Sequence, residues 1–128
     1  MSKGKSRLFV GSAGAKITET SISQHREKFL GKTAGQIAKM LQQRGYQTTI
    51  RKSTHASSRA KVIVIGNSSK VRNITQVQVS PGSKRHGNVP YVKISTTDIG
   101  VQKIIDGTPA QYKTDGTENA TLLFRRYF

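Results

Sequence analysis

The segment Arg51–Arg59 contains the residue types that phosphodiester chemistry requires. It reads RKSTHASSR and includes Lys52, Thr54 and His55 between its terminal arginines. Cleavage of RNA by its own 2′-hydroxyl needs a base, an acid and fixed cations for the charge that develops on the phosphate. His55 can transfer protons near neutral pH, and the lysine and arginines can hold the phosphate. An exposed basic turn without catalysis explains the same residues equally well.

A second segment of similar character is Ser80–Asn88, which reads SPGSKRHGN and contains Lys84, Arg85 and His86. Its glycines would let the backbone approach a ligand closely. If both segments lie at one rim of a sheet, His55 and His86 could act as a metal-independent acid–base pair. The alternative is a phosphate-steering loop that does no chemistry, and the sequence leaves open whether the two segments meet.

The third candidate is the strand predicted over Tyr91–Thr97. If its valine and isoleucine point into the core, Lys93 and Ser95 share the opposite face with the tyrosine. That face could present a catalytic cation at Lys93 and RNA contacts at Ser95 and Thr96. An ordinary amphipathic strand is an equally good interpretation.

The remaining candidates are weaker. Tyr112–Gly116 could join a site, but an Asp-Gly turn explains it better. His25 is interpreted as a surface residue of a helix. The three histidines lack ligand-spaced partners, so no zinc site is expected. Asp98 and Asp106 are too isolated for a two-metal nuclease, and we expect no cofactor.

Charge is very unevenly distributed along the chain. The 128 residues carry a formal net charge of +16, and residues 28–97 contain no Asp or Glu. Such a field attracts a polyanion, most plausibly nucleic acid. A catalyst built from this stretch must work without carboxylates. The sequence contains no Cys, which excludes a disulfide framework and thiolate metal sites.

Hydrophobic periodicity predicts an α+β domain in which N-terminal helices pack on a twisted, largely antiparallel sheet of four to five strands. Helices are expected over residues 17–30 and over Thr33–Arg44, the second capped by Thr33 and stopped by Gly45. Period-two patterns indicate strands at residues 46–50, 61–65, 73–80, 89–95 and 100–105, and a strand or tail at 121–128.

We expect residues 1–16 to form a basic flexible arm and residues 17–128 a single domain, monomeric in isolation. The apolar stretch of the arm, Leu8–Val10, is shorter than the apolar region of a secretory signal. No apolar run approaches the length of a membrane span.

The order of elements, with Lys52-Ser53-Thr54 at a strand end and the stretch Asn73–Ser95 after it, resembles the C-terminal toxin domains of bacterial polymorphic toxins. These toxins are deployed by contact-dependent inhibition or type VII secretion systems. The class it resembles is the barnase–EndoU–colicin–RelE (BECR) superfamily of ribonucleases. A Lys-Ser-Thr element occurs in one such toxin group, but the Pro and Asp expected soon after it are absent here.

The resemblance implies a metal-independent endoribonuclease toxin that cuts RNA, with tRNA as the expected substrate, and leaves a 2′,3′-cyclic phosphate. It implies a secreted or cell-surface parent effector, action in the cytoplasm of a target bacterium, and neutralisation by an acidic immunity protein. The main alternative is a non-catalytic basic RNA-binding module, which would usually offer aromatic stacking positions. A DNA-binding domain is a third interpretation, although no helix-turn-helix pair is evident.

Overall fold

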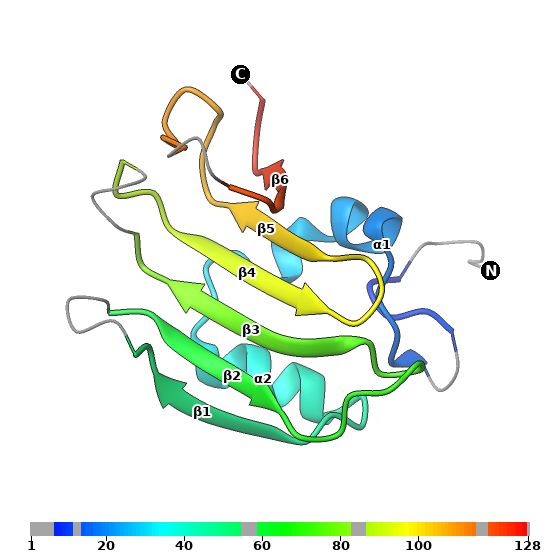
Figure 1. Cartoon of the computed structure of the whole chain (residues 1–128). Coiled ribbons are helices and arrows are strands. Elements are labelled where there is room, and N and C mark those ends of the chain that lie inside the picture. Colours follow the sequence, from blue (N-terminus) through cyan, green and yellow to red (C-terminus); the bar gives the residue numbers. More distant parts are fainter. Residues whose placement is uncertain (1–6, 12–13, 55–58, 83–86, 115–117, 128) are drawn as a thin grey trace.

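The computed structural model describes residues 7–11, 14–54, 59–82, 87–114 and 118–127. Two α-helices and a short 3₁₀ helix precede a six-stranded sheet, and both α-helices lie on the same face of that sheet (Figure 1). The predicted α+β class is therefore confirmed.

The first predicted helix, over residues 17–30, is shorter than expected and divides in two. Helix α1 (Glu19–Gln24) begins at the N-cap Thr18, whose hydroxyl accepts a hydrogen bond from the Ser21 amide at 3.0 Å. The 3₁₀ helix η2 (Arg26–Lys28) follows directly. Ile22 and Phe29 are fully buried, so this segment is fixed by packing more than by helix propensity.

Helix α2 (Ala34–Gln42) has the boundaries that its sequence signals predict to within two residues. Thr33 and Gln36 form a reciprocal capping box, with N–O distances of 3.1 and 2.8 Å. Ile37 and Leu41 are buried on the face toward the sheet. The predicted stop at Gly45 is confirmed, because its φ of 92° is a conformation that favours glycine.

The sheet has more strands than the sequence patterns predict. The strands are β1 (Thr48–Lys52), β2 (Lys61–Ile65), β3 (Ile74–Ser80), β4 (Tyr91–Thr96), β5 (Val101–Ile105) and β6 (Thr121–Phe124). They pair in sequence order, antiparallel throughout except for β5 and β6, which are parallel. The prediction of four to five strands is wrong because β6 adds a sixth. A parallel pair needs a long crossover, which residues 106–120 supply.

The register of the strands assigns every side chain to one of two faces. The inner face, which packs on α1 and α2, carries Ile63, Val77 and Ile94, all fully buried. The outer face is the opposite one, and Val62, Gln78 and Lys93 lie on it. Strand β1 is an exposed edge, and charged residues at its end protect such an edge from pairing with other chains.

Part of the segment predicted as a flexible arm belongs to this domain. Leu8, Phe9 and Ala15 are buried in the inner core, at relative exposures of 4%, 7% and 2%. The Tyr46 hydroxyl donates a hydrogen bond to the Ala15 carbonyl at 2.6 Å, and burial raises the pKa of that hydroxyl. Within this segment, Val10 forms a single antiparallel bridge with Lys16.

The side chain of Asn73 joins this N-terminal segment to the sheet. It is fully buried, accepts a hydrogen bond from the Ile17 amide and donates one to the Ile17 carbonyl, both at 2.9 Å. Its amide also donates to the Asp98 carboxylate at 2.9 Å. The Asn73 side chain thus satisfies both backbone hydrogen-bonding groups of Ile17, as a paired strand would do.

Replacing Asn73 with Ala is therefore expected to lower the free energy of unfolding by about 2–3 kcal/mol, because two backbone groups of Ile17 lose their partner in the interior. The exposed Asn119 provides the matched control, and Asn119→Ala should leave stability unchanged. Equilibrium denaturation of the two variants measures the difference. Equal midpoints would show that Asn73 does not anchor the N-terminal segment.

Candidate functional site

Three connections leave the sheet at the same end. Lys52 pairs with Lys61, and Ser80 pairs with Tyr91, which in turn pairs with Ile105. The β1–β2 connection, the β3–β4 connection and the start of the crossover after β5 are therefore neighbours at one rim (Figure 1). His55, Lys84, Arg85 and His86 belong to the first two connections but lie outside the described residues.

The β3–β4 connection packs directly on the crossover. Gly87 has a φ of 78°, and a Cβ built on it would lie 2.5 Å from the carbonyl oxygen of Gln111. Only glycine fits this close approach of two backbones. The second and fourth segments singled out in the sequence, around residues 80–88 and 112–116, are thus brought together by their described flanks.

A row of polar and cationic side chains crosses the outer face at the level of Lys93. In this register Arg51 is followed by Val62, Gln78, Lys93 and Lys103 on the successive strands β1 to β5. Residues directly opposite each other on antiparallel strands have Cβ atoms about 4.5–5.5 Å apart. The row therefore places polar side chains of four strands on one face, although Val62 within it and Lys103 at its end are buried.

Lys103 is the centre of a buried polar cluster at one end of this row. Its side chain is 6% exposed, and its ammonium group donates to the Tyr112 hydroxyl at 2.7 Å and forms an ion pair with Glu118, whose side chain is 12% exposed. The Tyr112 hydroxyl also contacts both carboxylate oxygens of Glu118, at 2.9 and 3.0 Å. The ammonium lies 4.4 Å from the ring centroid of Tyr91, an attractive geometry for a cation.

The direct pairing of Lys93 with Lys103 is unusual. Two like charges opposite each other on neighbouring strands destabilise a sheet. Glu118 compensates Lys103, whereas the half-buried Lys93 makes no ion pair with any residue that the structure describes. The local field at Lys93 is thus positive and suited to an anion.

Glu118 changes a conclusion drawn from the charge pattern. The stretch from residue 28 to 97 is acid-free, and a site built from it alone would lack a carboxylate. The crossover returns over the outer face and places Glu118 next to Lys103, one strand away from Lys93. A carboxylate from outside the acid-free stretch therefore lies close to this part of the outer face.

The other predicted site residues are distributed as follows. Lys52, Thr54 and Arg59 are exposed at the rim where the connections leave the sheet. Ser95 lies on the outer face with Lys93 and Tyr91, as the strand alternation predicts. Thr96 is the last residue of β4, at the far end of the sheet, where its hydroxyl donates to the Gly100 carbonyl at 2.8 Å.

Lys103 and Glu118 were not among the residues singled out from the sequence. A signal for Lys103 exists, since a lysine inside the apolar strand pattern VQKII must either reach solvent or find a partner. No local pattern marks Glu118, because its proximity to Lys103 is created by the crossover. Tyr112 belonged to a segment for which a simple turn was the preferred interpretation.

Within the described ranges, no group of three or more His, Asp or Glu side chains could hold a metal ion. None of the helices found there is long and apolar enough to cross a bilayer. Comparison of the chain with protein-family models, with curated proteins and with solved structures finds no match.

Proposed function

We propose that this protein is a metal-independent endoribonuclease that cuts RNA by attack of the 2′-hydroxyl and leaves a 2′,3′-cyclic phosphate. The observation that carries the proposal is Lys93 on the outer face, which lies opposite Lys103 on β5 and makes no ion pair with a residue that the structure describes. The ammonium of Lys93 would attract a phosphodiester placed beside it, and this attraction would be stronger in the transition state, where the negative charge on the phosphate increases.

The roles of the residues follow from their positions. Lys93 contacts the phosphate and stabilises the developing charge. Lys103 is a positioning residue, since Glu118 and Tyr112 hold its ammonium beside the row. Arg51, exposed on the same face, extends the cationic surface along the RNA backbone. Proton transfer is assigned to His55 and His86, from the connections that start at one rim of the sheet.

A non-catalytic RNA-binding module is less well supported. Such modules stack unpaired bases on exposed aromatic rings. Among the aromatic side chains in the described part of the chain, only Tyr127 is exposed, and it packs edge-on against Phe124 at a centroid distance of 5.6 Å. Tyr91 and Tyr112 are buried, so the outer face offers charge without a stacking platform.

We further propose that tRNA is the substrate, that the domain is delivered by a larger effector, and that an acidic immunity protein neutralises it. The net charge of +16 favours both partners, because complementary charge accelerates association and raises specificity. An immunity protein that covers Lys93 and Arg51 would block the same surface that binds RNA.

Incubation of the purified protein with total tRNA in EDTA is expected to give discrete fragments ending in a 2′,3′-cyclic phosphate, resolved on a denaturing gel. Intact tRNA that is nevertheless shifted on a native gel would overturn the enzyme assignment and favour the binding module. His55→Ala and His86→Ala are the accompanying variants, and we expect at least one to lose activity. Full activity in both would eliminate the histidine mechanism, and the variant His25→Ala, at the partly exposed C-cap of α1, controls for general effects.

A further inference from the structure

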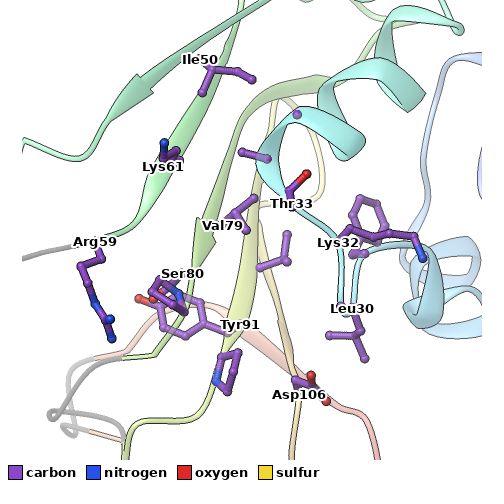
Figure 2. A pocket seen from close by; sticks show the side chains of 17 residues that line it. Leu30, Lys32, Thr33, Ile50, Arg59, Lys61, Val79, Ser80, Tyr91 and Asp106 are labelled. Atoms are coloured by element: carbon purple, nitrogen blue, oxygen red, sulfur yellow. The ribbon is translucent and has the colours of Figure 1, made fainter.

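A pocket of about 560 Å³ opens on the inner face, away from the Lys93 row. It lies at the rim end of the sheet, where the start of α2 leaves the ends of β1 to β4 uncovered (Figure 2). The volume is in the range of sites that enclose a small organic ligand.

The floor of the pocket is aliphatic. Ile50, Val79 and Val92 line it, and Ile50 is 42% exposed although its side chain is large and apolar. These three residues come from β1, β3 and β4 and share the inner face. An apolar surface of this kind is covered by a flat, weakly polar group more favourably than by water.

The walls are suited to an anion. Figure 2 shows Arg59 and Lys61 on one side of the pocket and Thr33, which caps α2, on the other. Neither Arg59 nor Lys61 forms an ion pair with a residue in the described ranges. The pocket also contains Asp106, but Arg125 neutralises this carboxylate at 2.7 Å. The net charge around the pocket is therefore positive.

The pocket adjoins the outer face through the ends of β3 and β4. Ser80 and Tyr91 line the pocket, and the Tyr91 ring also contacts the Lys103 ammonium of the outer-face cluster. A chain that passes over this rim can therefore touch both the Lys93 row and the pocket.

We propose that the pocket holds one unpaired nucleotide of the RNA substrate, with its base on the aliphatic floor and its phosphate against Arg59 and Lys61. This inference rests on the proposed function, since it assigns a subsite to the same RNA. Such a subsite would hold an unpaired base without an exposed stacking ring, because aliphatic side chains would enclose the base.

The test is titration of the full chain with 5′-mononucleotides in EDTA, followed by amide chemical shifts. Saturable shifts at Gly35, Ile50 and Val79 are expected, with at least tenfold weaker binding of inorganic phosphate and of the nucleosides. Shifts confined to Gln78, Lys93 and their neighbours on the outer face would overturn the proposal. Equally tight binding of a short acidic peptide at Gly35 would also overturn it, since the pocket would then be a protein-docking site.

Gly35→Leu is the variant that blocks the pocket. Gly35 is a helical residue of α2, and a Cβ built there meets only the Thr33 hydroxyl at an ordinary 3.8 Å. The variant should therefore fold, and its affinity for mononucleotides should fall at least tenfold. Lys39→Ala, an exposed change further along the same helix, should leave affinity unchanged.

The failure of the subsite and the failure of the enzyme give different results. If mononucleotides shift Gly35 but tRNA stays intact, the pocket assignment stands and the endoribonuclease proposal fails. The subsite proposal alone fails under two results together. The Gly35→Leu variant would cut tRNA at the wild-type rate, and mononucleotides would leave the amide shift of Gly35 in the wild-type protein unchanged.

Discussion

Replacing Lys93 with Met is expected to slow tRNA cleavage by about 100- to 1,000-fold, the usual effect of removing a fixed group that stabilises developing charge. Met keeps the aliphatic stem of the half-buried lysine, so packing on the outer face is retained. The variant also removes the like-charge contact with Lys103, and its thermal stability should equal or exceed that of the wild type.

The measurement is a single-turnover rate in EDTA, with the melting temperature of each variant alongside. Lys39→Met changes charge by the same amount at an exposed position on α2 and is expected to retain the wild-type rate. Lys93→Arg keeps the charge and should be faster than Lys93→Met. It should not reach the wild-type rate, because the planar guanidinium group differs in shape from an ammonium group. A wild-type rate in Lys93→Met would remove Lys93 from the mechanism.

A further readout separates binding from catalysis. If Lys93 contacts a phosphate in the ground state, its loss should make the plot of log affinity against log salt concentration less steep, by the amount that one phosphate contact contributes. If it acts only in the transition state, affinity and its salt dependence should stay constant while the rate falls. Either result keeps Lys93 in the site and specifies when it engages the phosphate.

The local elements of the fold were predictable because their signals are local. Thr33 caps α2 and Gly45 ends it, as the sequence indicates. The run KVIVI at residues 61–65 is a strand with buried residues on both faces. Strand β1, in contrast, begins two residues later than the period-two pattern suggests. Its expected first residue, Tyr46, instead turns into the core and bonds the Ala15 carbonyl, a contact that depends on distant sequence.

The same distinction applies to the site. Alternation along β4 correctly places Lys93 and Ser95 on one face, because side chains in a strand have a period of two. The ion pair of Lys103 with Glu118 could not be predicted, because it depends on the parallel pairing of β5 with β6. The intervening residues 106–120 are rich in turn formers, and turn chemistry does not indicate where a crossover returns.

The buried pair gives the largest expected effect on stability. Glu118→Ala removes a carboxylate from an ammonium whose side chain is 6% exposed. Loss of one partner from a buried ion pair typically costs about 3–5 kcal/mol, because the remaining charge is poorly solvated. We therefore expect Glu118→Ala to lower the free energy of unfolding by about that amount, measured by denaturant titration at pH 7.

The double variant Lys103→Met/Glu118→Leu distinguishes charge from packing. Replacing a buried pair by apolar residues of similar volume is often neutral or stabilising, so this variant should recover most of the lost stability. A more solvent-accessible pair, Arg125 with Asp106, supplies the control, since Asp106→Ala should cost less than about 1 kcal/mol. Equal destabilisation by Glu118→Ala and by the double variant would show that shape, not charge, holds the cluster.

The double variant also tests what the cluster does for the site. If Lys103 only supports the sheet, a stably folded Lys103→Met/Glu118→Leu protein should cut tRNA at the wild-type rate. The net charge is unchanged in this variant, so a slower rate would show that the ammonium opposite Lys93 acts on the bound phosphate more strongly than the carboxylate that pairs with it. A variant that is slow but stably folded would separate the electrostatic contribution of Lys103 from its structural contribution. No single substitution can do so, because each would leave one buried charge without its partner.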